Sequence, residues 1–173
     1  WYTDAVSGEL IESSTLMDLA NNHTLYAHRR ANTNTEYKVK HWLQNIGAGS
    51  EQNNTNYTEQ TTTTHTGTSD TTVNAPRKTF SGFTQPASKS ITIDRHGTSI
   101  VNYYYTRNYY TITYNANGRG TPSFTSKDIQ FGDEYVLPTI SATGYTFDGW
   151  YTAASGGTKI TSTTQLIKNS AHT

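Results

Sequence analysis

The stretch that decides the fold is SIVNYYYTRNYYTITYNANG, Ser99 to Gly118, where six of the chain's 13 tyrosines fall within 12 residues. Aromatic and β-branched side chains of this kind are typical of strands. Because successive side chains of a strand point to opposite faces, Tyr103 and Tyr105 are expected to share a face and Tyr104 to oppose it. A second alternating run, Tyr109 to Tyr114, follows almost at once. The stretch therefore predicts the last strand of one module followed directly by the first strand of the next.

The composition indicates small β-rich cores. Of the 173 residues 32% are hydrophobic, and the mean hydropathy is −0.72, which favours small separate cores over one large core. The 13 basic and 13 acidic residues cancel, so no net field attracts nucleic acid or an anionic membrane. The absence of cysteine excludes disulfides and cysteine-based metal sites. Without a long apolar run or a leader-like pattern, we expect no membrane insertion and an interior part of a longer protein.

The two ends of the chain repeat one another. Residues 1–24 align without a gap with residues 150–173, and ten of the 24 positions are identical, among them the opening WYT and the closing His-Thr. The offset is 150 − 1 = 149 residues. This similarity predicts a tandem array with a period of 149 residues, of which the chain holds one period and an overlap.

Within that period we expect two units. The first spans residues 36–107, after a linker at 29–35, and the second spans residues 108–173 and lacks its last strand. Residues 1–28 are then the C-terminal part of a preceding copy of the second unit.

Several local elements are also predicted. The alternating segment EYKVKHW, Glu36 to Trp42, predicts a strand. A turn at Asp94 to Gly97 predicts a hairpin of Ser90–Ile93 with Ser99–Tyr105. The polar run Ser50–Asp70 is expected to form an edge hairpin or a mobile loop. Short helices or turns are expected in SSTLMDLA at residues 13–20 and in TSTTQLIKNS at residues 161–170.

Three motifs in the second unit carry a family resemblance. YTITYNANGRGTPS, IQFGDEYVLP and GYTFDGWYTAASGGTKIT follow one another from Tyr109 to Thr173, and the last is repeated in part from Trp1 to His28. This pattern resembles the Listeria-Bacteroides repeat, the internalin B-type repeat. Arg119 departs from it, because the family usually has another glycine there.

The first unit has a different resemblance. EYKVKHW, VNAPRKTFSGF and SIVNYYYTR are similar to segments of the mucin-binding-protein type of β-grasp module. Together the two resemblances imply a mainly β (α+β) fold of small tandem β-grasp or ubiquitin-like modules, arranged end to end. They also imply an extracellular location on a bacterial cell surface or cell wall.

Aromatic residues of the strand motifs are expected to form module cores and the junction between modules. A sugar-stacking platform is the alternative for the tyrosines. The expected core and junction residues are Trp1, Tyr2, Tyr103, Tyr105, Tyr110, Tyr114, Tyr145, Phe147 and Trp150.

The segment Leu25–His28 (Leu25, Tyr26, Ala27 and His28) is expected to form a closing strand. An open sheet edge recruits a partner strand, so we expect this segment to pair with the open module of a neighbouring copy, head to tail. The competing expectation is that both ends fray.

Chemistry-bearing residues are sparse. Related surface modules sometimes join a first-strand lysine to a last-strand asparagine, which here means Lys38 or Lys40 with Asn102. The six histidines lack metal-ligand spacing. No phosphate loop, GxSxG or HExxH motif occurs, so we expect a protein that is not an enzyme and binds no cofactor.

Two function classes remain from the sequence. One is a structural spacer, a stalk or filament of tandem modules that carries an adhesive tip. The other is an adhesion module that binds glycan or mucin through exposed aromatic side chains, for which the candidates are Tyr57, Phe80, Phe83 and Tyr104. No cluster combines aromatic side chains with carboxylates, which favours the spacer.

Overall fold

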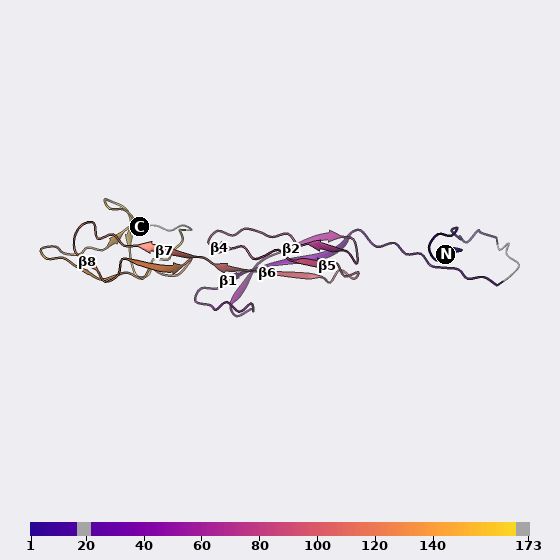
Figure 1. Cartoon of the computed structure of the whole chain (residues 1–173), viewed down its shortest axis with the longest axis horizontal. Helices are drawn as coiled ribbons and strands as arrows, with labels where there is room; N and C mark the ends of the chain where they lie inside the picture. The colour runs from indigo at the N-terminus through magenta and orange to yellow at the C-terminus, as the bar shows by residue number, and fades with distance from the viewer. Residues whose placement is uncertain (17–21, 169–173) are drawn as a thin grey trace.

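The chain forms an elongated molecule whose parts follow one another in sequence order (Figure 1). The structure, a computed structural model, describes residues 1–16 and 22–168. Residues 1–16 and 22–28 lie at one end, a unit built from residues 35–107 lies in the middle, and the described residues after 107 form the other end. The described residues are mainly β and contain no helix, and their sheets are open.

Seven strands belong to the middle unit or lead out of it: β1 Thr35–Gln44, β2 Tyr57–Gly67, β3 Thr72–Asn74, β4 Phe83–Thr84, β5 Ser90–Thr92, β6 Ile100–Arg107 and β7 Tyr109–Thr113. Five shorter strands follow: β8 Thr121–Pro122, β9 Ser126–Gln130, β10 Ile140–Ser141, β11 Trp150–Tyr151 and β12 Lys159–Ile160. The predicted strand at residues 36–42 is confirmed within β1.

The middle unit is built on a mixed sheet of order β2-β1-β6-β4. Its central strands β1 and β6 run parallel, whereas β2 and β4 flank them in antiparallel pairs. The two central strands alternate buried and less buried residues, since one face packs against the core. This pattern matches the alternation predicted for Tyr103, Tyr104 and Tyr105.

The polar run forms the edge of this sheet. Its threonines make up most of β2, which pairs with β1 from Thr35↔Gly67 to Gln44↔Tyr57. Only Tyr57 is buried in this strand. A polar strand is stable there because the backbone pairs along one side and the β-branched side chains face solvent. Of the two predictions for Ser50–Asp70, the edge position is therefore confirmed and the mobile loop is not. The segment forms one long strand that pairs with β1 instead of a hairpin of its own.

The predicted hairpin after Ser90 is wrong, although its turn is present. Gly97 has a φ of 72° and donates its N–H to the carbonyl of Asp94 at 2.9 Å. The strands on either side separate, since β5 pairs with β3 and β6 pairs with β1 and β4. The turn therefore connects two sheets, and the parallel partner β1 takes the position that β5 would have in a hairpin.

The core of the middle unit consists largely of aromatic and β-branched residues. Its buried members are Tyr37, Val39, Ala75, Ile93, Val101, Tyr103 and Tyr105, with Leu43, Val73, Phe80, Phe83 and Ile91 packed against them. Two of its tyrosine hydroxyls are bonded to the backbone: that of Tyr103 donates to the carbonyl of Ala75 at 2.9 Å, and that of Tyr105 accepts from the N–H of Lys78 at 3.0 Å. A core of this composition stays small but leaves few polar atoms unsatisfied.

The second unit packs around a separate core of Ile112, Tyr114, Ile129 and Leu166. Leu166 is fully buried, and its backbone bonds to Gly132 and Asp133 close the unit at 2.7 and 2.8 Å. Residues 161–168 therefore form a turn and a bridge instead of a helix. Residues 13–16 also contain a turn, while residues 17–20 and 169–170 of the two helix candidates lie outside the described residues.

The sequence repeat is also a structural repeat. Tyr2 bridges Leu10, and Tyr151 pairs with Lys159, which are equivalent positions under the offset of 149. The bond from Thr3 N–H to the Glu9 carbonyl (3.1 Å) recurs from Thr152 to Thr158 (3.0 Å). Residues 1–16 and 150–165 therefore adopt the same local hairpin.

Candidate functional site: the junction between the two units

The junction contains a single residue, Asn108, between β6 and β7. Its backbone joins the two units, because its N–H donates to the carbonyl of Gly82 at 2.9 Å and its carbonyl accepts from Phe131 at 2.8 Å. Its side chain accepts a 2.5 Å bond from Thr84 Oγ1 and donates to the hydroxyl of Tyr110 at 3.2 Å. A connection of this length has no slack, so the orientation of the units depends on these contacts.

Arg107 is the charged centre of the junction. Its side chain is 1% exposed, yet it carries a full positive charge. The guanidinium donates to the carbonyl of Phe131 through Nε at 2.5 Å and to that of Asn45 through Nη1 at 3.3 Å. Its Nη2 forms an ion pair with Asp133. One side chain thus connects the last strand of the first unit to a turn of the second.

Two glutamines hold the backbone of Arg107. Gln44 Oε1 accepts the N–H of Arg107 at 3.0 Å, and Gln130 Nε2 donates to its carbonyl at 3.1 Å. Gln130 Nε2 also lies 3.4 Å from Gln44 Oε1. The amides therefore satisfy the backbone polar groups at the point where β6 leaves the first sheet.

An aromatic contact covers the junction. The rings of Phe83 and Phe131 meet edge to face with centroids 5.9 Å apart. Gly82 has a φ of 81°, and a Cβ there would overlap the ring of Phe131. Glycine is required because the backbone is left-handed and because a ring of the other unit packs against it.

Most of the predicted core tyrosines lie in the two cores. Tyr103 and Tyr105 are fully buried in the first, and Tyr114 is buried in the second with Tyr110 packed against it. Burial, reinforced by Tyr135, raises the pKa of Tyr114 to about 12. Trp150 also packs on the second core and donates to the carbonyl of Pro138 at 3.0 Å.

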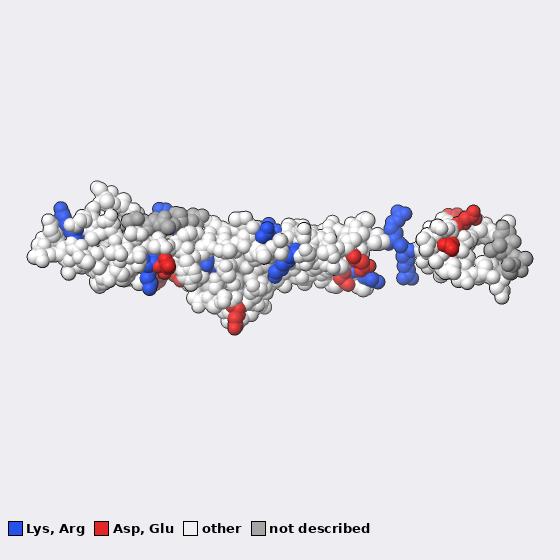
Figure 2. All heavy atoms as spheres, in the orientation of Figure 1, with Lys and Arg blue, Asp and Glu red and all other residues white. Residues whose placement is uncertain are grey.

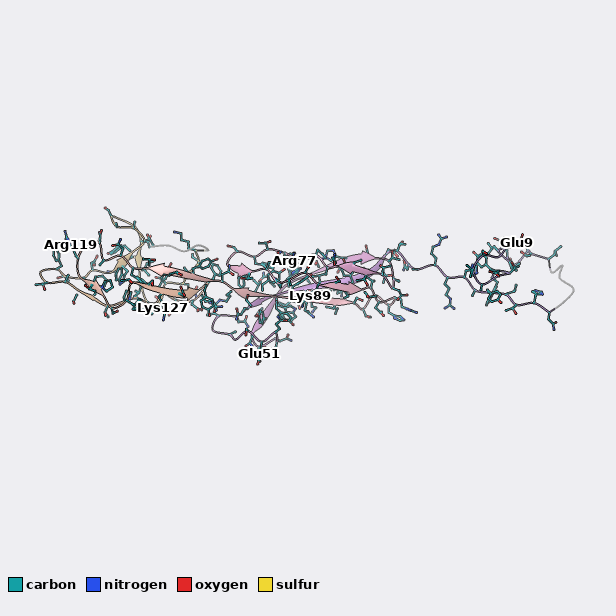
Figure 3. All side chains as sticks on the ribbon, viewed as in Figure 1. Glu9, Glu51, Arg77, Lys89, Arg119 and Lys127 are labelled. Atoms are coloured by element: carbon teal, nitrogen blue, oxygen red, sulfur yellow. The ribbon has the colours of Figure 1, made fainter. Side chains whose placement is uncertain are left out.

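Three of the predicted core residues lie at the surface instead: Trp1 is 65% exposed, Tyr145 58% and Phe147 48%. Trp150, the counterpart of Trp1, packs edge to face on Tyr114, and no such contact is made by Trp1 among residues 1–16 and 22–28. The ring of Tyr145 lies 4.5 Å below the guanidinium of Arg119. Arg119, the residue that departs from the family pattern, lies at the far tip of the second unit (Figure 3).

The four aromatic residues named as glycan contacts form no open platform. Tyr57 is 1% exposed and packs edge to face on Tyr104, whose other neighbour is Trp42. Phe80 and Phe83 pack against the first core. The sequence missed this because alternation gives the face of a strand but not what covers it.

The side chain of His41, a residue of β1, is buried in the first unit. Tyr105 Oη accepts the N–H of Lys78 at 3.0 Å and lies 3.0 Å from His41 Nδ1. Because a hydroxyl can donate one bond and accept two, the direction of the bond between Tyr105 and His41 depends on which ring nitrogen of His41 carries the proton. Burial lowers the pKa of His41, and the charges of Lys78 and His65 act in the same direction.

The residues considered for a cross-link are close but otherwise engaged. Lys40 is in register with Asn102 across β1 and β6, whereas Lys38 is in register with Ile100. Lys40 Nζ pairs with Glu59 at 2.9 Å, and Asn102 Oδ1 accepts from Trp42 Nε1 at 2.9 Å. The cross-link stays a prediction, and an intact mass tests it.

Leu25–His28 meets residues of its own chain. Tyr26 exchanges two backbone bonds with Tyr2, at 2.7 and 2.8 Å. The ring of His28 stacks on that of Tyr2 with centroids 3.8 Å apart, and His28 Nε2 lies 2.7 Å from the Asp4 carbonyl.

Charged side chains of the described residues form no concentrated patch on the face drawn in Figure 2. Figure 2 shows charged atoms scattered over a mostly uncharged face. No group of three or more potential metal ligands occurs among residues 1–16 and 22–168. In the same residues the structure has no helix with the length and apolar character needed to cross a membrane.

Sequence reasoning missed the central residue of this site, although a signal was present. Val101, Tyr103 and Tyr105 are buried on one face of β6, and Arg107 is the next residue on that face. Extending the alternation by one step would have placed a charge toward the interior. Such a charge needs partners, and among the described residues its carboxylate partner is Asp133 of the following unit.

Comparison with known families identifies part of the chain. No curated protein and no solved structure matched it. The family model of the Listeria-Bacteroides repeat domain matches residues 110–173, which confirms the resemblance of the second unit but not that of the first. Residues 110–173 are thus similar to a repeat domain of bacterial surface proteins.

Proposed function

We propose that this chain is a repeating structural unit of a bacterial cell-surface adhesin, stalk or extracellular filament, and that it acts as a rigid spacer. The observation that carries the proposal is the buried Arg107, whose partners come from both units. A spacer must transmit orientation along its length. A buried charge that is satisfied only when both units are in place couples their orientations.

In this proposal the units are β-grasp-like modules placed end to end. The parallel pair β1–β6, flanked by antiparallel strands, supports this description for the first unit. The structural repeat of residues 1–16 and 150–165 supports a tandem order. The proposed location is extracellular, at the cell surface or cell wall, and the proposed partner is another copy of the repeat, head to tail.

The proposal assigns no catalysis, cofactor, nucleic acid or membrane insertion to the chain. Binding of glycan or mucin through Tyr57 and Tyr104 receives no support, because these rings are packed against each other. A mucin pull-down on the whole chain remains the direct test of that alternative function.

Small-angle scattering tests the spacer. A fragment of residues 32–173, which contains both units and the single-residue junction between β6 and β7, is compared with its Arg107→Ala variant, and we expect one narrow distribution of maximum dimensions for the first and a broader one for the second. Arg95→Ala is the control, because Arg95 forms an exposed pair with Asp70 within the first unit. A broad distribution for the unmodified protein would contradict the proposal.

A further inference from the structure

One edge of the sheet in the middle unit is long and has no partner strand. The sheet has the order β2-β1-β6-β4, and its edge strands differ in length, since β4 has 2 residues and β2 has 11. β2 pairs with β1 along one side, and no other strand pairs with it among residues 1–16 and 22–168. The described residues before and after the middle unit extend from its two ends (Figure 1), so they leave the side of β2 open.

The pairing with β1 shows which backbone groups of β2 point outward. The N–H of Lys38 donates to the carbonyl of Ser99 at 2.9 Å, on the β6 side of β1. The register partner of Lys38 in β2 is Thr64. Because Lys38 turns its backbone toward β6, Thr64 lies in a pair without backbone bonds and points its own N–H and C=O away from β1. By alternation, Thr62 and Thr66 also point theirs outward.

This edge lacks the features that usually prevent a sheet edge from pairing. Natural edges are protected by charged side chains, proline or bulges. The bulge of β2 lies opposite His41 and Trp42 and leaves Gln60 without a register partner. From residue 61 to residue 67 the register is regular, and the sequence contains no lysine, arginine, carboxylate or proline. Residues 61–67, here called the β2 edge, therefore present a regular, uncharged template for another strand.

We propose that the β2 edge binds the β2 edge of a second copy, antiparallel, with Thr64 opposite Thr64 of that copy. In this register Thr62 lies opposite Thr66, so every outward-pointing residue meets another. Each such pair exchanges two backbone hydrogen bonds. A symmetric pair centred on Thr62 would instead include the bulge at Gln60, and one centred on Thr66 would extend beyond Gly67, where β2 ends.

The side chains favour a second copy as the partner. Thr62, Thr64 and Thr66 are exposed, so threonine meets threonine across the contact, and such cross-strand pairs are favourable. On the other face Thr63 meets His65, and within one chain these side chains already lie 2.9 Å apart, Oγ1 to Nε2. No like charges lie directly opposite one another. The two copies of Lys38 are three strand spacings apart, about 14 Å, where salt screens their repulsion.

The pairing gives the proposed spacer a second activity, and this step rests on the proposed function. β2 runs along the length of the molecule (Figure 1), so antiparallel pairing places two chains side by side in opposite directions. Stalks that point in opposite directions come from two facing surfaces. The contact is isologous and closes at two copies, and its repetition along an array strengthens a weak single contact. The β2 edge therefore supplies homophilic adhesion between cells.

Opposite charges at Thr64 test the contact in the whole chain. By sedimentation, the unmodified chain should move with concentration from 19.2 kDa toward twice that mass and no further. Thr64→Lys and Thr64→Glu should each weaken self-association by roughly tenfold or more, because like charges then lie opposite one another. Their equimolar mixture should regain the double mass. Thr113→Lys, at an exposed threonine of β7, is the control and should associate like the unmodified chain. Variants that associate like the control, or a mixture that stays monomeric, would overturn the proposal.

Cysteine trapping gives a second measurement that tolerates weak binding. The chain has no cysteine, and opposed residues of a backbone-bonded pair have Cα atoms about 5.5 Å apart, which suits a disulfide. Under mild oxidation Thr64→Cys should therefore form a linked dimer, whereas Thr113→Cys should stay monomeric at the same concentration. If Thr64→Cys gives no more dimer than Thr113→Cys, a second copy does not occupy the β2 edge and the proposal fails. Scattering from single chains reports the junction at Arg107 separately, so this failure leaves the spacer intact.

Discussion

Replacing Arg107 by alanine tests the coupling between the units most directly. The change removes three hydrogen bonds, to the carbonyls of Phe131 and Asn45 and to the carboxylate of Asp133. A neutral hydrogen bond contributes about 1 kcal/mol and one to a charged group roughly 1.5–3 kcal/mol. The carboxylate of Asp133 is 37% exposed, so water replaces part of what it loses. We therefore expect the free energy of unfolding to fall by about 3 kcal/mol, which is the lower end of the roughly 3–5 kcal/mol lost when one partner of a buried ion pair is removed.

Urea unfolding of the whole chain measures this loss. Arg95→Ala removes an arginine from a pair in which both side chains are more than half exposed, and should change the free energy by less than about 0.5 kcal/mol. A double-mutant cycle of Arg107→Ala with Asp133→Asn isolates the pair itself. If Arg107→Ala costs no more than Arg95→Ala, the guanidinium does not hold the junction and the reasoning is refuted.

Three further outcomes follow from the structure. Gly82→Ala should destabilise the chain by roughly 2–4 kcal/mol, because the new methyl group overlaps the ring of Phe131 and the backbone is left-handed. Gly47→Ala is also left-handed but has open space around it, so urea unfolding should show a smaller loss of about 1–2 kcal/mol. Because the pKa of His41 is lowered in the folded state, the unfolded state takes up the proton first as the pH falls. The free energy of unfolding should therefore be highest above about pH 6.5 and fall below it by up to roughly 1.4 kcal/mol per pH unit, and His41→Gln should flatten this dependence. Limited trypsin digestion should cut at Arg29 before Arg107, because the latter is 4% exposed and fully bonded; mass spectrometry of the first fragments decides.

The sequence predicted the long strands of the first unit and β7, but not the short strands of the second unit and few of the pairings. Alternation identified β1, β6 and β7, since period two depends only on which face is buried. It did not identify the parallel partner of β6, because the choice between β5 and β1 depends on the whole sheet. The hairpin predicted after Ser90 failed for this reason.

The candidate site was predicted in position but not in composition. The sequence placed the junction between two tyrosine-rich strands, where β6 ends and β7 begins, yet the residues emphasised there were aromatic. Arg107, Gln44 and Gln130 were missed because their partners come from segments up to 86 residues apart in the sequence. A polar side chain at the end of a strand looks solvent-exposed until the unit that covers it is known.

The two connections of the repeat differ in a way that bears on the shape of an array. Between β6 and β7 a single residue carries backbone and side-chain bonds to both units. Between residues 28 and 35 the described hydrogen bonds to the following unit begin at Asn32, whose carbonyl accepts the N–H of Ser69. The side-chain hydroxyl of Thr35 is hydrogen-bonded to that of Ser69. Because the first connection is bonded throughout and the second only from Asn32 onward, we expect bending of the proposed array to concentrate at residues 29–31. In the proposed stalk each period is then one rod that is stiff at the β6–β7 junction, and the extension of the array depends on how far the connection at residues 29–31 bends.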